Sequence, residues 1–171
     1  MRKFLYLLLA ACFMSVLSST SMAADGELEN RLIKALKIKK NGLDRQARSR
    51  PVILAYQQAG ILKRSRNRRI DYMDFYIVDK PASFMGQKLV LLEEEYMDTW
   101  VGCCVSPGMG LAVQVSSNTD AMEKFALENA CTLTPHFDLK ARFKDYLIKH
   151  QLPVADYAYL SCRERDLPED E

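Results

Sequence analysis

The N-terminal segment constrains this chain most, because it sets the compartment in which the rest of the chain folds. Arg2 and Lys3 precede an apolar run over 4–17, and mostly small or polar residues follow it up to Ala23. This three-part pattern is typical of a secretory signal peptide, and the run is shorter than the roughly 20 residues of a membrane-spanning helix. We therefore expect residues 1–23 to be a signal peptide and the mature protein to be periplasmic or secreted, without a transmembrane segment.

The same segment also contains a match to a lipid-attachment motif. Leu9, Ala10, Ala11 and Cys12 resemble a bacterial lipobox, in which the cysteine is acylated and becomes the new N-terminus. The leader would be short, and the apolar run continues past Cys12, whereas lipoproteins usually turn polar there. Lipid anchoring through Cys12 is therefore the less favoured alternative.

Four cysteines remain after residue 23, and they are Cys103, Cys104, Cys131 and Cys162. An even number of cysteines in an exported chain predicts two disulfides. Neighbouring residues on a strand point to opposite faces, so Cys103 and Cys104 should have different partners. We expect Cys104–Cys131 and Cys103–Cys162, with the exchanged pairing as a close alternative. A vicinal Cys103–Cys104 bond is disfavoured because it would strain the intervening peptide.

Composition and patterning predict a single α+β domain over 24–171. Hydrophobic residues make up 49% of the chain and charged residues 27%, which excludes disordered and multi-pass membrane classes. Apolar spacing of three and four predicts helices, and these cover 26–40, 50–59, 119–130 and 139–150. Aromatic and branched runs predict strands, and these cover 70–78, 87–94, 99–105, 111–115 and 154–162. Short connections favour antiparallel pairing, so we expect a sheet of about four to five strands packed by helices, with an N-terminal helical pair.

Charge divides the expected domain into unlike parts. Residues 24–69 carry 13 Lys or Arg and 4 Asp or Glu, whereas residues 70–171 carry 9 and 18. The two halves either compensate each other within the fold, which is the simpler explanation, or present faces of opposite sign. The parts that we expect are a helical N-terminal part over 24–62, a basic connector over 63–69, a sheet-and-helix core over 70–162 and a polar tail over 163–171.

Motifs of common catalytic and cofactor sites do not occur in the sequence. There is no G-x-S-x-G, no phosphate-binding loop and no H-E-x-x-H. Cysteines of an exported chain are more often oxidised than metal-bound, so we expect no metal and no cofactor. Glu93 and Glu95 of the run Glu93-Glu94-Glu95 would share a strand face and could supply paired carboxylates. A solvated strand end is the simpler explanation of this run.

One constellation of residues points to an enzyme. Cys104, His136 and then Asp138 or His150 follow each other in an order similar to that of some cell-wall cysteine peptidases. A cysteine nucleophile usually lies at a helix N-terminus, whereas Cys104 lies at the end of an apolar strand candidate over 99–105 that is followed by Ser-Pro-Gly. A small cysteine-dependent envelope hydrolase that uses Cys104 and His136 is therefore the alternative function.

The basic stretch from Arg45 to Arg69 is the most unusual local feature of the chain. Arg64, Arg66, Arg68 and Arg69 lie close together, and arginine suits bidentate contact with phosphate or carboxylate. Exported proteins meet anionic lipids, acidic glycans and acidic proteins, and nucleic acid is not expected there. We therefore expect a non-catalytic binding or accessory protein of the bacterial envelope that contacts a protein or an anionic envelope component through these four arginines. The structural alternative is a connector that pairs with the acidic half of the same fold.

Overall fold

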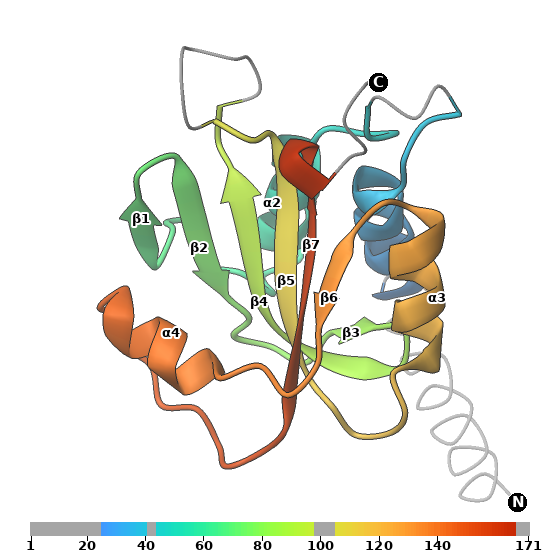
Figure 1. Ribbon diagram of the computed structural model, residues 1–171. Helices are drawn as coiled ribbons and strands as arrows, with labels where there is room; N and C mark the ends of the chain where they lie inside the picture. The colour runs from blue at the N-terminus through green and yellow to red at the C-terminus, as the bar shows by residue number, and fades with distance from the viewer. Residues whose placement is uncertain (1–24, 41–43, 98–104, 167–171) are drawn as a thin grey trace, which may run out of the picture.

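The fold is an antiparallel sheet with helices on both faces (Figure 1). It is seen in a computed structural model that describes residues 25–40, 44–97 and 105–166. The helices are residues 25–36, α2 (Ser49–Gln58), α3 (Asp120–Glu128) and α4 (Leu139–Asp145). The strands are β1 (Arg68–Ile70), β2 (Met73–Ile77), β3 (Ser83–Phe84), β4 (Gln87–Glu95), β5 (Gly108–Gln114), β6 (Thr132–Thr134) and β7 (Tyr157–Arg163). A 3-10 turn over Glu164–Asp166 follows β7.

The sheet has seven strands, in the order β1-β2-β4-β5-β7-β6, with β3 paired to β4 beside this path. The α+β class and the antiparallel pairing are confirmed, but the expected four to five strands are too few. A single strand was predicted over 70–78, whereas a turn at Asp71, with a φ of 49°, separates Ile70, the last residue of β1, from β2. β3 and β6 have two and three residues and are too short to give an alternating pattern. The strand predicted over 99–105 lies outside the described residues, except for Val105.

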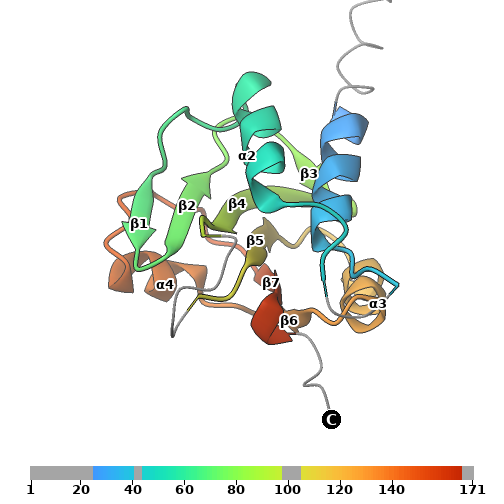
Figure 2. The same cartoon turned by 90° about the horizontal axis from the view of Figure 1, so that it is seen from above.

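Two apolar cores lie on opposite faces of the sheet. The face that we call the α2 face is covered by the helix over 25–36, by α2 and by α3 (Figure 2). The opposite face, which we call the α4 face, is covered by α4 and the loop that follows it. Each face buries large side chains, such as Leu92 and Leu111 on the α2 face and Phe75 and Leu91 on the α4 face. Because both faces are covered, polar side chains on the central strands become buried as well.

Several predicted helices are shorter in the structure than the periodicity indicates. The first helix ends at residue 36, because Ile38 forms a bridge with Arg45 and the chain turns back. α4 ends at Asp145, and the left-handed Leu147, with a φ of 53°, prevents its continuation to 150. At its start, the Asp138 carboxylate accepts a hydrogen bond from the Ala141 N–H and so caps the helix.

The disulfide of the described residues joins Cys131 to Cys162, so both of the expected pairings are wrong. Cys131 immediately precedes β6, and the first residue of β6, Thr132, lies opposite Ser161 of β7. Antiparallel pairing therefore brings Cys131 and Cys162 together, with a Cα–Cα distance of 4.4 Å. This pairing belongs to the arrangement that was disfavoured, and it was missed because β6 was not predicted. Each of the two expected disulfides uses either Cys103 or Cys104, and both of these residues lie outside the described residues.

Arg45 fixes the chain that follows the first helix against this crosslinked region. Its guanidinium donates to the carbonyl oxygens of Leu36, Asn129, Ala130 and Arg163. The Nη1 atom of Arg45 also lies 3.6 Å from the Cys131 Sγ atom. This residue of the basic stretch therefore has a structural role, since it satisfies four backbone acceptors with one side chain.

Within the described residues, no helix is long and apolar enough to span a membrane. The expected signal peptide over 1–23 and the acylation site at Cys12 lie outside these residues. Both stay predictions.

Candidate functional site

Three consecutive glutamates at the end of β4 are buried, although a solvated strand end was expected there. Glu93 and Glu94 are fully buried, and Glu95 is 4% exposed. The expectation was wrong because β4 lies between β2 and β5 in a sheet covered on both faces. Strand alternation places Glu93 and Glu95 on the α4 face and Glu94 on the α2 face. On each face, arginines from other elements of the fold form ion pairs with a buried glutamate.

On the α4 face, the fully buried Glu93 is held by a network of hydrogen bonds and ion pairs. The Tyr159 hydroxyl donates to the Glu93 Oε2 atom at 2.6 Å, and the Arg163 Nη2 atom donates to the same oxygen at 2.8 Å. The Arg163 Nη1 atom donates to the Tyr159 hydroxyl at 2.8 Å, and Arg142 approaches Glu93 at 3.3 Å. Burial, together with the charge of Glu93, raises the pKa of the Tyr159 hydroxyl. We call Glu93, Arg142, Tyr159 and Arg163 the Glu93 cluster.

Gly110 makes the contact between Arg163 and Glu93 possible. In the register of the sheet, Gly110 of β5 lies between Glu93 of β4 and Ser161 of β7. A Cβ atom at position 110 would lie 2.5 Å from the Tyr159 hydroxyl oxygen and 3.0 Å from both terminal nitrogens of Arg163. The Arg163 side chain can therefore cross β5 and reach Glu93 only because residue 110 has no side chain.

Arg163 also differs from the sequence prediction, which made it the first residue of a polar tail. It is the last residue of β7 and is fully buried. The signal that could have found it is the alternation of Tyr157, Tyr159, Ser161 and Arg163, which places all four on one strand face.

On the α2 face, two buried carboxylates face arginines that reach the surface. Arg69 donates to both carboxylate oxygens of Asp74 at 2.6 Å, and the Arg66 Nε atom lies 3.2 Å from the same carboxylate. Asp74 and Glu94 are partners in the register of β2 and β4, and Arg50 lies 3.2 Å from Glu94. We call this group the Asp74–Glu94 cluster, and it consists of Arg50, Arg66, Arg69, Asp74, Tyr76 and Glu94.

The electrostatics of this cluster resemble an acid–base pair, but its burial argues against catalysis. Burial raises the pKa of Glu94, and the nearby charge of Asp74 adds to this effect, while Arg50 opposes it. The Tyr76 hydroxyl lies 3.5 Å from both carboxylates, and burial also raises its pKa. Unequal environments of two carboxyl groups are typical of acid–base catalysis. Here Asp74 is 2% exposed and Glu94 is fully buried, so a substrate does not reach either carboxyl group.

The cluster instead holds cationic groups at the surface. The side chains of Arg50, Arg66 and Arg69 are 54%, 47% and 35% exposed. Three guanidinium groups face two carboxylates, so the cluster keeps at least one uncompensated positive charge. The Arg69 guanidinium also lies 3.6 Å from the centroid of the Tyr96 ring, which restricts its orientation further.

The four arginines predicted for binding do not form one patch. Arg66 and Arg69 meet at Asp74 on the α2 face, as the structural alternative of internal compensation requires. Arg68 lies opposite Phe75, so strand alternation directs it toward the other face. Arg64 and Arg68 are exposed, and within the part of the chain that the structure describes their side chains form no ion pair. Sequence reasoning missed Asp74 as the residue that organises this surface.

The alternative cysteine-dependent site is only half described. Cys104 lies outside the described residues, so its pairing with His136 stays a prediction. The His136 imidazole is 84% exposed and lies 3.1 Å from Asp156. β6 runs toward the start of β7, whereas β5 begins opposite Arg163 at the end of β7. His136 therefore lies at the opposite end of the sheet from Gly108. Among the described residues, no group of His, Cys, Asp and Glu side chains is placed to hold a metal ion.

Comparison of the chain with protein-family models, with curated proteins and with solved structures found no match. The function of the chain therefore has to be inferred from the geometry of the site.

Proposed function

We propose that this chain is an exported, disulfide-stabilised, non-catalytic binding or accessory protein of the bacterial envelope. It would contact an anionic partner, either an envelope component or an acidic protein surface, through the basic residues on and beside β1. The observation that carries this proposal is the sharing of one buried carboxylate, Asp74, by the partly exposed Arg66 and Arg69.

The geometry at Asp74 favours recognition of a phosphate or carboxylate. Buried Asp74 fixes Arg69 through two hydrogen bonds, so less side-chain entropy is lost when a ligand binds. The remaining donors of Arg66 and Arg69 stay accessible, and Arg50 adds a third guanidinium on the same face. Arg64 and Arg68 add positive charge that within the described residues no carboxylate neutralises, which would attract an anionic partner at longer range.

Export is supported by two independent features of the chain. The sequence over 1–23 has the pattern of a signal peptide, and Cys131–Cys162 is a bond that persists in oxidising compartments. A binding role is favoured over the cysteine-dependent hydrolase because a cysteine nucleophile usually lies at a helix N-terminus, whereas Ser-Pro-Gly follows closely after Cys104. Counting free thiols by alkylation and mass spectrometry separates the two, because the hydrolase requires a reactive Cys104 thiol.

The direct test is association of the mature protein with vesicles that contain phosphatidylglycerol, measured by co-sedimentation at increasing salt. We expect Arg66→Gln/Arg69→Gln to weaken the association at least about tenfold, since charge-assisted hydrogen bonds to both guanidiniums are lost. The matched control is Lys88→Gln/Lys124→Gln, which changes the net charge equally at exposed positions elsewhere and should alter the association less than about twofold.

A second variant keeps the test valid if loss of the Asp74 contacts disturbs folding. Arg64→Gln/Arg68→Gln removes no described ion pair, so it should weaken association and leave the thermal midpoint unchanged. The same variants are compared in affinity capture from envelope extract, which detects an acidic protein partner. Association with vesicles and extract that is insensitive to salt, or equal for all variants, would overturn the proposal.

A further inference from the structure

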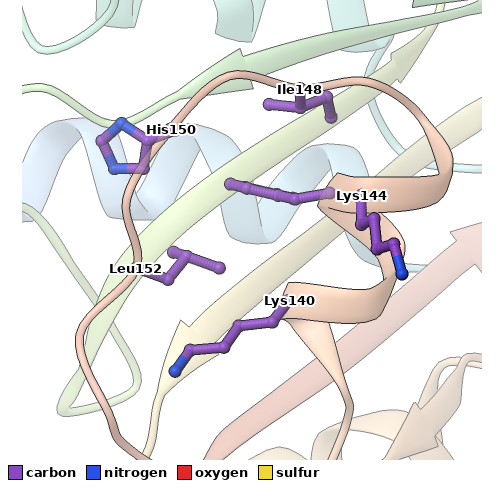
Figure 3. Close-up of a pocket in the computed structure, with 6 residues that line it drawn as sticks. Lys140, Lys144, Ile148, His150 and Leu152 are labelled. Carbon is purple, nitrogen blue, oxygen red and sulfur yellow. The ribbon is translucent and has the colours of Figure 1, made fainter.

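A cavity of about 300 Å³ lies between α4 and the loop that follows it (Figure 3). It belongs to the α4 face, whereas the Asp74–Glu94 cluster lies on the α2 face. The side chains that line the cavity are Lys140, Phe143, Lys144, Ile148, His150 and Leu152. Neither the sequence patterns nor the proposed function accounts for this cavity.

The base of the cavity is apolar and fixed in position. Phe143 and Ile148 are 3% and 6% exposed and belong to the core of the α4 face, and Leu152 packs against the same core. The Ile148 N–H donates to the Phe143 carbonyl at 2.8 Å, which ties the loop to the end of α4. Further along, the Tyr157 hydroxyl donates to the Pro153 carbonyl at 2.9 Å. The cavity is therefore formed before any ligand binds, which lowers the cost of binding.

The rim of the cavity is cationic. Lys140 and Lys144 are four residues apart on α4 and so lie on one side of the helix. Figure 3 shows Lys140 extending from α4 toward the loop that carries Leu152, with the His150 ring across the cavity from it. Among the residues that the structure describes, no acidic side chain lines the cavity and neither lysine takes part in an ion pair.

We infer that this cavity binds an anionic amphiphile, a carboxylate that carries a medium-length acyl chain. The acyl chain would lie against the partly exposed Leu152 and the small exposed parts of Phe143 and Ile148, where each Å² of newly buried apolar surface contributes roughly 25 cal/mol. The carboxylate would accept a hydrogen bond from Lys140, while Lys144, which extends from α4 in a different direction (Figure 3), adds positive charge at the rim and His150 is a donor across the cavity. A small inorganic anion would leave the base uncovered, and an uncharged chain would leave both ammonium groups without a partner. This inference does not depend on the proposed function, because it uses none of the arginines around β1.

The probe is decanoate, added below its micelle concentration to the mature protein and followed by calorimetry and by NMR. We expect saturable binding that shifts the signals of the Ile148 methyl groups and the His150 ring. Acetate lacks the chain and decanol lacks the charge, so each should bind at least about tenfold more weakly. Decyltrimethylammonium has the opposite charge and should not bind.

Variants locate the binding. Lys140→Gln/Lys144→Gln should weaken decanoate at least about tenfold, since both groups are exposed and their exchange leaves the core intact. Lys149→Gln is the matched control, because Lys149 lies on the same loop but does not line the cavity, and its effect should stay below about twofold. Leu152→Glu introduces a negative charge at the cavity and should abolish binding.

The inference fails if decanol binds as tightly as decanoate, or if acetate does. It also fails if Lys140→Gln/Lys144→Gln binds decanoate as the unmodified protein does, or if decanoate shows no saturable binding while anionic vesicles do. Loss of vesicle association in the Arg66→Gln/Arg69→Gln variant with intact decanoate binding would separate this cavity from the surface around β1.

Discussion

The glutamates at the end of β4 pair with arginines of different exposure on the two faces of the sheet. On the α4 face, Glu93 is paired with Arg163, and both side chains are fully buried. On the α2 face, Asp74 and Glu94 are buried, but the arginines that pair with them are 35–54% exposed. A pair that excludes water on both sides can only hold strands together. A pair that is open on its cationic side can also bind a partner. Burial of the arginine therefore separates a structural cluster from a candidate binding surface.

The largest expected effect comes from breaking the closed pair. Arg163→Met leaves Glu93 buried without its main partner and should lower the free energy of unfolding by about 3–5 kcal/mol. Urea denaturation measures this change. The control is Glu93→Gln/Arg163→Met, which removes both charges and should recover much of the loss. An effect of Arg163→Met below about 1 kcal/mol would show that the Glu93 cluster does not hold the sheet together.

A smaller effect is expected from the open pair. Asp74→Asn removes the carboxylate shared by Arg66 and Arg69, but both guanidiniums regain hydration because they are partly exposed. The free energy of unfolding should fall by about 2 kcal/mol, measured by urea denaturation under the same conditions. If Asp74→Asn destabilises the protein as much as Arg163→Met does, the two faces do not differ in the way that the exposure of their arginines indicates.

The smallest effect concerns Glu95, whose buried Oε1 atom has no hydrogen-bond partner among the residues that the structure describes. Burial raises the pKa of Glu95 above its ordinary value of 4.5, and Arg163 and Arg165 offset this only in part. As the pH rises above 4.5, the unfolded chain releases this proton before the folded chain does, so the free energy of unfolding falls. Glu95→Gln should therefore stabilise the protein by about 1 kcal/mol near neutral pH.

Thermal unfolding across a pH series checks this sign. The advantage of Glu95→Gln should shrink as the pH falls and vanish once Glu95 is protonated in both the folded and the unfolded state. A variant that is less stable than the unmodified protein near neutral pH would show that the Glu95 carboxylate is stabilised by Arg163.

The sequence predicts those parts of the molecule that depend on local patterns. Helical spacing located α2 and α3 to within two residues, and runs rich in branched residues located β4 to within one residue and β5 to within three, because these elements are long enough to give a local signal. The basic composition around residues 63–69 pointed to the region of the Asp74–Glu94 cluster. Each of these predictions uses neighbours in the chain.

The parts that could not be predicted depend on residues far apart in sequence. Arg163 looks like the start of a polar tail unless it is known that Gly110, on another strand, leaves room for it. The Cys131–Cys162 bond follows from the register of β6 with β7, and three residues of β6 give no periodic signal. Asp74 neutralises the arginines that lie on its own face of the sheet. The register of the β1–β2 hairpin determines which arginines these are, and the local density of basic residues does not.

The bare backbone at position 110 also has an evolutionary consequence. Gly110 on β5 leaves the space that Arg163 on β7 needs to reach Glu93. Exchange of either residue alone should therefore lower the stability of the protein. Related chains should accordingly vary these two sites in concert: wherever a larger residue replaces Gly110, a shorter, uncharged one should stand in place of Arg163, and the glutamate should be lost with it.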